Sequence, residues 1–243
     1  MDDQPESNPH KNRFENGYFK RQYKNRLVFS GSDKPILYSA WRRKLAKKSH
    51  GRLLEVGCGE GNFLRRAQKD FSFACGADLS NEGLKSAARH GLSLARTDAE
   101  NLPYKSACFD FLVAFDLVEH LPGPEKFFAE AARVLKSEGE LILTTPNPDS
   151  LGSRLKKGKW FGHQDPTHCS IKNAPAWQKI FDAAGFAVIS SGTDALWDSP
   201  YLPAVPAFLQ KIFFSGLSNF FFLIEPYFPW NFGENLVFWL KKK

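Results

Sequence analysis

The sequence predicts an α/β fold in which a seven-stranded, mostly parallel sheet forms the middle of three layers and the last strand runs antiparallel. Three observations predict it. Short apolar runs alternate with amphipathic helical stretches over most of the chain, as is typical of parallel sheets covered on both faces. Glycines directly follow the first run. No helix of ordinary length is predicted between the last two runs, which suits an antiparallel pair.

Length and composition are those of one globular domain. The chain has 243 residues, of which 42% are hydrophobic and 24% are charged, and it contains no internal repeat. These values are close to the average for globular proteins, so they exclude bulk disorder and allow a sizeable core. Only the polar residues 1–12 are predicted to be disordered.

The cysteines and the N-terminal residues indicate a reducing compartment. The cysteines form no Cys-x-x-Cys pair, which argues against a zinc ribbon and against a disulfide framework. They are Cys58, Cys75, Cys108 and Cys169. The first residues contain no apolar stretch of the kind found in signal sequences. We therefore expect a cytoplasmic protein.

Three strands and two helices are predicted in the first half of the sheet. The strand at 52–56 is apolar and ends at glycines, which break it. A helical stretch at 62–69 leads to the strand at 73–77, and a second helical pattern at 81–90 leads to the strand at 92–96. Each strand is short and largely apolar, as buried parallel strands are.

The second half of the sheet continues the alternation with clearer end signals. Pro124 begins an amphipathic helix at 124–136, because proline is favoured in the first turn of a helix. Gly185 ends a helix at 174–185, where glycine is the usual residue after the last turn. The remaining strands are predicted at 109–115, 140–145, 186–192 and 235–240.

Two segments outside this alternation carry the unusual composition of the chain, whose net charge is +7. Residues 13–50 are predicted to form a basic helical cap, because twelve Lys or Arg residues stand against two acids between residues 10 and 50. The insertion at 196–232 holds twelve aromatic residues. Its apolar part has too many polar residues for a comfortable transmembrane span. It is either a lid that packs on the sheet and lines the substrate pocket, or a helix that lies in a membrane surface.

The strongest local signal for a binding site is the segment E-V-G-C-G-E-G at 55–61. Glycines at the carboxyl end of a strand let the backbone turn tightly and approach a ligand closely. The spacing differs from the dinucleotide fingerprint, and Glu55 would repel a diphosphate, so a ligand with an ammonium group fits better. Asp78 and Asp98 follow the next two strands, where carboxylates can bind ribose hydroxyls and an adenine amino group.

As a set, these motifs resemble the class I S-adenosylmethionine-dependent methyltransferases, and they are most similar to the small-molecule branch with ubiquinone-biosynthesis-like members. The resemblance covers residues 51–193 and the last strand. Besides E-V-G-C-G-E-G it rests on the acid of G-A-D-L-S, the Asp of T-D-A-E-N-L-P-Y and the long segment from F-D-F-L-V-A-F to T-T-P-N-P. One departure is Ser-Glu-Gly at 137–139, where the family commonly has Pro-Gly-Gly. The resemblance implies a Rossmann-like methyltransferase domain over 51–243.

The resemblance also implies a site for the cofactor S-adenosylmethionine. Glu55 and the glycines would hold its methionine end, Asp78 its ribose, and Asp98 with Ala99 and Glu100 its adenine. The implied cofactor residues are Tyr18, Glu55, Gly57, Cys58, Gly59, Asp78, Leu79, Asp98, Ala99 and Asp116.

Methyl transfer to a hydroxyl needs alignment and a base, and two histidines, His120 and His168, lie in loops beyond the strand ends. They are candidates for the catalytic base. If the turn after the fourth strand is helical, Asp116, Glu119 and His120 share a face, and together with His168 they are candidate ligands for a divalent metal. Some relatives with an acid-x-x-Glu-His pattern use a metal in this way, and many others are not known to. In a third interpretation both histidines are structural and bind loop backbone.

We expect a small apolar or lipid-linked acceptor that is methylated at oxygen, because the insertion at 196–232 is rich in phenylalanine. A basic surface next to an apolar one also predicts contact with anionic membrane, at its inner face. Nucleic acid is a less suitable partner, since the insertion is poor in arginine. The two rival hypotheses are an RNA methyltransferase and a non-catalytic cofactor-binding or membrane-adaptor protein.

Overall fold

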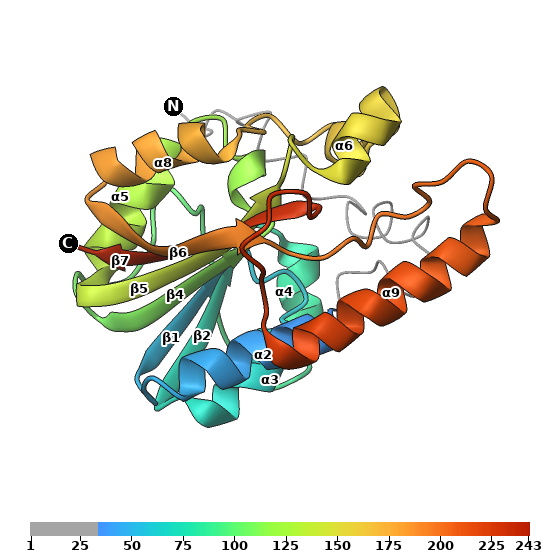
Figure 1. Cartoon of the computed structure of the whole chain (residues 1–243). Coiled ribbons are helices and arrows are strands. Elements are labelled where there is room, and N and C mark those ends of the chain that lie inside the picture. Colours follow the sequence, from blue (N-terminus) through green and yellow to red (C-terminus); the bar gives the residue numbers. More distant parts are fainter. Residues whose placement is uncertain (1–33) are drawn as a thin grey trace, which may run out of the picture.

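A seven-stranded sheet forms the centre of the computed structural model, which describes residues 34–243 (Figure 1). The strands lie in the order β3-β2-β1-β4-β5-β7-β6. β7 pairs antiparallel with β5 and with β6, whereas the other neighbouring strands pair in parallel. The strands are β1 (Arg52–Val56), β2 (Phe73–Asp78), β3 (Ser93–Arg96), β4 (Phe109–Phe115), β5 (Leu135–Pro146), β6 (Phe186–Thr193) and β7 (Asn235–Lys242).

Helices cover both faces of this sheet and complete the three layers. α5 and α8 lie on one face, and α2 and α3 lie on the other (Figure 1). The helices are α2 (Pro35–Ala46), α3 (Leu64–Ala67), α4 (Asn81–Ala88), α5 (Pro124–Val134), α6 (Leu151–Lys156), α7 (Phe161–Gln164), α8 (Ala174–Ala183) and α9 (Ala207–Ile224). Short 3-10 turns are η2 (Gln68–Asp70), η3 (Val118–His120) and η4 (Lys157–Lys159).

The central strands send alternate side chains into two separate cores. In β4, Leu112 packs in the core under α5 and α8, whereas its neighbours Phe111 and Val113 pack in the core under α2. All three are nearly inaccessible to solvent. Burial on both faces explains why these strands are continuously apolar in the sequence.

Local signals set the ends of the helices. Ser80 caps α4 by accepting a hydrogen bond from the backbone N–H of Gly83 (3.2 Å), and Asn173 caps α8 in the same way through Ala176 (3.1 Å). Gly185 follows α8 with φ of +80°, a conformation that favours glycine.

The predicted fold class is confirmed, and three details of it are wrong. β5 begins at Leu135, five residues before the predicted strand, because the chain turns directly from α5 into the sheet. The predicted helix at 62–69 is only the single turn of α3 followed by η2. An 18-residue helix, α9, does lie between β6 and β7. The antiparallel pairing nevertheless holds, since α9 runs beside α2 rather than crossing the sheet between the two strands.

The cap predicted at 13–50 is described only from residue 34, and there it contains the helix α2. Trp41 of α2 is fully buried and stacks on Tyr227, with the ring centroids 5.7 Å apart. Tyr18 and the tail predicted at 1–12 lie outside the described residues.

Candidate functional site

The glycine turn after β1 has backbone conformations that side chains disfavour. Gly57, Gly59 and Gly61 have φ of +75°, +48° and +73°. The N–H of Gly57 donates to the carbonyl of Ala77 in β2 (2.8 Å), so the turn folds over the end of the neighbouring strand. A Cβ on Gly57 would lie 3.0 Å from the side chain of Leu117. Glycine is therefore needed here by the backbone and by the space around it.

Asp78 joins the glycine turn to the end of β2. Its carboxylate accepts hydrogen bonds from the N–H of Gly59 and from the N–H of Ser80, both at 2.7 Å. The residue lies at the carboxyl end of its strand, as predicted, and is only partly buried. Its oxygens are therefore presented at the edge of the sheet where a ligand could reach them.

Glu55 is buried beneath the same turn. Its carboxylate accepts a hydrogen bond from the N–H of Leu64 at the start of α3 (3.0 Å). Burial raises the pKa of this carboxyl well above its usual value, and the nearby charge of Asp78 raises it further. Burial likewise raises the pKa of the Cys58 thiol. In this structure Glu55 holds α3 in place, and its predicted contact with a methionine moiety stays a prediction.

The residues predicted to hold an adenine follow the end of β3, the strand that pairs with β2. Asp98 accepts a hydrogen bond from the N–H of Glu100 (3.0 Å), and Ala99 is buried beside it. The carbonyl of Leu79 accepts from Arg96 of β3 (3.1 Å). The structure brings Asp78, Leu79, Asp98 and Ala99 to one edge of the sheet, and their ligand contacts stay predictions.

Asp116 lies at the end of β4, apart from the predicted metal ligands. Its φ of +50° turns the chain away from the strand. Its carboxylate accepts hydrogen bonds from the hydroxyl of Thr144 (2.7 Å) and from the ammonium of Lys34 (2.8 Å). The helical turn η3 begins only at Val118. Asp116 therefore lies outside the helical turn, so the condition for a face shared with Glu119 and His120 is not met.

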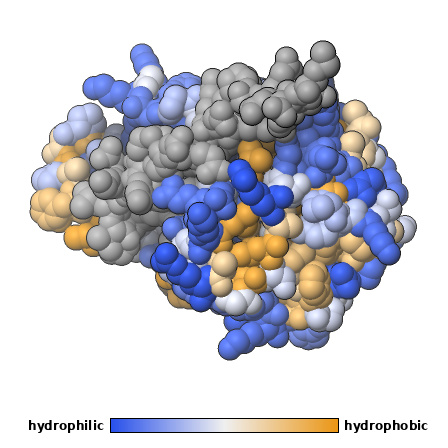
Figure 2. Space-filling view, turned by 180° about the vertical axis from the view of Figure 1, so that it is seen from behind, coloured by the Kyte–Doolittle hydropathy of each residue, from blue (hydrophilic) through white to orange (hydrophobic). Residues whose placement is uncertain are grey.

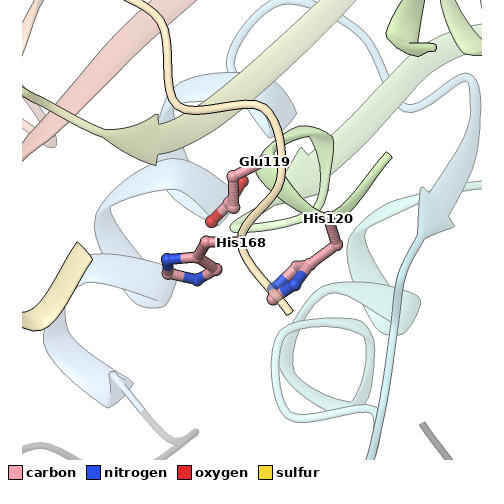
Figure 3. A group of neighbouring side chains, drawn as sticks. All are labelled: Glu119, His120 and His168. Atoms are coloured by element: carbon pink, nitrogen blue, oxygen red, sulfur yellow. The ribbon is translucent and has the colours of Figure 1, made fainter. Parts of the chain in front are cut away.

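The other three predicted ligands do come together (Figure 3). Glu119 and His120 come from η3, His168 comes from the loop before α8, and each offers a ligand atom within 4.8 Å of the others. In the part of the chain that the structure describes, this is the one such group of three. The two imidazole rings lie with their centroids 4.7 Å apart.

Hydrogen bonds fix which nitrogen of each ring carries the proton. The hydroxyl of Thr167 donates to Asp165 (2.6 Å), whose pKa is kept low, despite burial, by hydrogen bonds from Thr167. Because that hydroxyl has a single proton, Nδ1 of His120 must donate to it across 2.8 Å. Nδ1 of His168 lies 2.7 Å from the carbonyl of Gly162 and can only donate to it. Nδ1 therefore carries a proton in both rings.

Burial favours the neutral forms of Glu119 and His120. The pKa of His120 is lowered to about 4 by burial and by the neighbouring His168. The pKa of Glu119 is raised well above its usual value by burial and by the charge of Asp116. One carboxylate oxygen of Glu119 is buried and has no hydrogen-bond partner among the described residues. Such an oxygen costs stability unless a proton, a ligand or a cation meets it.

Sequence reasoning missed several residues that hold this region together. Lys34 reaches Asp116 from the segment before α2, and a lysine far from any motif gives no signal of this. Two buried acids also escaped. Asp194 accepts from Trp197 (2.8 Å), and Glu234 accepts from Tyr201 (2.6 Å), so both tie the insertion to the sheet. The sequence signal that could have found these two acids is their position, one just before the aromatic insertion and one just after it.

Comparison with known proteins finds methyltransferases in each case. A family model for a methyltransferase domain matches residues 32–191. A phthiotriol/phenolphthiotriol dimycocerosates methyltransferase of Mycobacterium ulcerans is 36% identical over 106 residues, which are 41% of this chain and 39% of that protein. A fatty-acid O-methyltransferase of Mycolicibacterium smegmatis is 32% identical over 104 residues, covering 40% and 38% of the two chains.

The curated relatives are matched over part of their length, since this chain spans 59% or less of the first of them. Among solved structures, a SAM-dependent methyltransferase from Archaeoglobus fulgidus superposes with a TM-score of 0.65 at 20% identity. That match covers 93% of this chain and 100% of the other, and it shows that the two share a fold.

Proposed function

Because this chain belongs to the methyltransferase domain family, we propose that it transfers a methyl group from S-adenosylmethionine to an oxygen of a small apolar or lipid-linked acceptor. The observation that carries the proposal is the gathering of the glycine turn, Asp78 and Asp98 at the carboxyl edge of the sheet, beside the group of Glu119, His120 and His168.

The residues at the carboxyl edge fit this cofactor. The carboxylates of Asp78 and Asp98 suit ribose hydroxyls and an adenine amino group, and the close backbone of the turn suits a ligand without a diphosphate. When bound, S-adenosylmethionine supplies a methyl group already activated by the sulfonium. The protein then has to exclude water, align the acceptor and, for a hydroxyl, take up its proton.

We assign the acceptor's proton to the histidine pair. His168 donates from Nδ1 to the carbonyl of Gly162, so Nε2 is the nitrogen that would take up the proton, with the carboxylate of Asp165 3.8 Å from it to stabilise the charge. The hydrogen bonds of His120 through Thr167 to Asp165 hold the second ring in the same tautomer. A base of this kind is needed for a hydroxyl acceptor more than for an amine, which supports oxygen as the methylated atom.

A second candidate role for the same group is to hold a divalent cation. The unpartnered oxygen of Glu119 and two imidazoles that each donate from Nδ1 would fit such an ion through their Nε2 atoms. Each ring also donates its other N–H to an oxygen, as metal-bound histidines do. A cation held by Glu119, His120 and His168 would polarise the acceptor oxygen and lower its pKa.

The apolar nature of the acceptor is supported by the surroundings of the site. Trp197 and Tyr201, in the insertion, lie near the carboxyl edge, and the ammonium of Lys34 contacts both the ring of Trp197 (5.3 Å to its centroid) and Asp116. The names of two relatives refer to a fatty acid and to phthiotriol or phenolphthiotriol dimycocerosates.

The test is the fraction into which transferred methyl groups partition. The purified chain is incubated with methyl-tritiated S-adenosylmethionine and, in separate reactions, with a total lipid extract, a water-soluble metabolite extract and total RNA. We expect tritium in the organic phase of the lipid reaction and a loss of that signal with Asp78→Ala. Label in RNA would support an RNA methyltransferase instead. Cofactor binding without any transfer would support the non-catalytic hypothesis.

A further inference from the structure

The exposed side of helix α9 is apolar, which is the opposite of what is expected for a surface helix in water. α9 projects from the domain beside α2 (Figure 1). Its side toward the protein contains Gln210, Ser218 and Phe222, which are 3%, 4% and 6% exposed. Two of these three are polar. A helix on the surface of a water-soluble domain normally buries its apolar stripe and exposes polar residues.

The outward side of α9 is apolar along its whole length of about 27 Å. Eight exposed Phe, Leu and Ile side chains lie on this side, within about half of the helix circumference. They are Phe208, Leu209, Ile212, Phe213, Leu217, Phe220, Leu223 and Ile224. Hydrophobic surface is visible at the outer end of α9, on the left of the space-filling view (Figure 2). We call these eight residues the α9 apolar face.

The buried polar residues of α9 make specific contacts with the domain. The amide of Gln210 accepts hydrogen bonds from the N–H groups of Tyr201 and Leu202 (2.7 and 2.8 Å) and donates to the carbonyls of Leu202 and Val205 (both 2.7 Å). The hydroxyl oxygen of Ser218 lies 3.2 Å from the carbonyl oxygen of Leu196, outside the helix, besides its bond to the carbonyl of Phe214 within α9 (2.6 Å). These contacts fix which side of the helix faces outward.

By length and composition, α9 is the one described helix able to cross a membrane. Its attachments favour a different arrangement. Near its start, Tyr201 is held by Gln210 and donates to Glu234 (2.6 Å). At its end, Glu225 pairs with Lys44 of α2. Both ends are thus held to the same domain, whereas a spanning helix would place them on opposite sides of the bilayer.

Basic side chains lie near both ends of the α9 apolar face. Arg43 and Lys47 are exposed in and just after the last turn of α2, where Arg43 reaches the carbonyl of Leu223 (3.5 Å). At the other end, Lys156 of α6 pairs with Asp198 (2.8 Å) and lies over the ring of Tyr201 (5.3 Å to its centroid). Exposed basic residues flank it in α6 and η4, and they are Arg154, Lys157 and Lys159. α9 itself has no acidic residue.

We propose that the α9 apolar face binds the surface of an anionic lipid bilayer, with α9 in the plane of the membrane and the basic residues of α2, α6 and η4 against the headgroups. Apolar side chains bordered by cations match the boundary between acyl chains and anionic headgroups. A protein partner or a second copy of this chain would need no such basic border. This inference is independent of the acceptor, because it rests on residues outside the site.

The test is sedimentation with vesicles of phosphatidylglycerol and phosphatidylcholine, using the full chain. We expect the wild type to pellet with these vesicles at low salt, to be partly released at high salt, and to bind pure phosphatidylcholine weakly. The apolar variant replaces Phe208, Phe213, Phe220 and Ile224 with Ser. It should lower the partition coefficient by on the order of a hundredfold or more. Phe73→Ser with Ile189→Ser removes exposed apolar side chains elsewhere and should have little effect.

A basic variant tests the second half of the proposal. Replacing Arg154, Lys157 and Lys159 with Gln should lower binding by roughly 10–100-fold and weaken its salt dependence. Its control replaces three other exposed basic residues with Gln, and these are Lys85, Arg89 and Lys105. Unchanged pelleting of the apolar variant, or a wild type that stays in the supernatant at low salt, would overturn the inference. A soluble dimer that the apolar variant converts to monomer would instead indicate a second copy as the occupant.

Failure of the membrane inference can be told apart from failure of the proposed function. Methyl transfer to an acceptor in detergent micelles does not require vesicle binding. We therefore expect the apolar variant to keep its affinity for S-adenosylmethionine and its activity in micelles. Transfer in micelles without vesicle binding would reject the membrane surface alone.

Discussion

Nδ1 of His120 lies 2.8 Å from the hydroxyl oxygen of Thr167, which in turn donates a hydrogen bond to Asp165 (2.6 Å). This chain of hydrogen bonds makes Thr167 a positioning residue for His120. Thr167→Val leaves the ring without its acceptor, so we expect kcat to fall by about 10–100-fold. KM for S-adenosylmethionine should stay the same. Steady-state kinetics check this, and Thr167→Ser should restore most of the activity. An equal loss in the Ser and Val variants would show that packing, rather than the hydroxyl, matters.

The carboxylate of Asp78 is expected to bind the cofactor. Asp78→Ala should weaken binding of S-adenosylmethionine by about 1–3 kcal/mol, the usual cost of losing hydrogen bonds to a charged group. Isothermal titration calorimetry measures this change. The surface variant Asp182→Ala is the matched control, since that acid lies on α8 and is more than half exposed. An affinity that does not differ between the two variants would remove Asp78 from the site.

Gly57 is expected to serve the cofactor and not only the fold. Gly57→Ala and Gly91→Ala both place a side chain at positive φ, of +75° and +67°, so each should lose about 1–2 kcal/mol of stability. Only the first lies in the glycine turn, and a Cβ on Gly91 meets nothing within 4 Å. Urea unfolding should therefore show a loss in both variants, larger for Gly57→Ala because its Cβ also crowds Leu117, whereas calorimetry should show weaker cofactor binding for Gly57→Ala alone. Equal affinities would contradict the prediction.

The buried carboxyl of Asp194 should make stability depend on pH. Burial is the main cause that raises its pKa to about 7 from 3.8. Between these values the folded chain keeps a proton on Asp194 that the unfolded chain loses. The contribution of Asp194 to the free energy of unfolding is therefore largest below about pH 4. It should then fall by about 1.4 kcal/mol per pH unit up to about pH 7. Asp194→Asn does not titrate, so its free energy of unfolding should lack this slope, whatever its overall stability. Parallel curves for the two proteins would contradict this.

Chelation separates the two roles of the histidine group. If His168 acts as a base without a cation, turnover should be unchanged after dialysis against EDTA, and this is the outcome that we expect. Glu119→Gln keeps the size of the side chain but weakens a metal site. If no cation is used, the response of turnover to added Mn²⁺ should therefore be the same in this variant as in the wild type. Loss of turnover on chelation and its recovery with Mg²⁺ or Mn²⁺ would assign the metal role to the group instead.

Much of the sheet could be predicted because its strands are buried on both faces. β1 and β4 have the predicted bounds, since continuous apolar runs between glycines and polar turns have few alternative interpretations. The placement of Asp78 and Asp98 at strand ends followed from the same runs. β5 was predicted to be too short, because its first residues, Leu135–Gly139, are mostly polar and resemble a turn.

The geometry of the candidate site could be predicted only in part. The sequence predicted that His120 and His168 lie on one side of the sheet. It could not predict that Asp116 has a positive φ and lies outside the group that these histidines form with Glu119. The orientation of α9 was equally hidden, because its composition does not say which side faces the protein. Gln210 is turned inward by its hydrogen bonds to the backbone of residues 201–205, in the loop before the helix, and the conformation of that loop could not be predicted from the sequence.

The central claim is that this chain transfers a methyl group to oxygen on an apolar acceptor. The most direct measurement uses S-adenosylmethionine with a ¹³C-labelled methyl group and a total lipid extract, followed by carbon NMR of the organic phase. The chemical shift of the labelled carbon distinguishes methyl groups on oxygen from those on nitrogen or carbon. We predict an O-methyl resonance that is absent with Asp78→Ala. A labelled methyl on carbon or nitrogen, or label recovered only in water-soluble products or RNA, would contradict the claim.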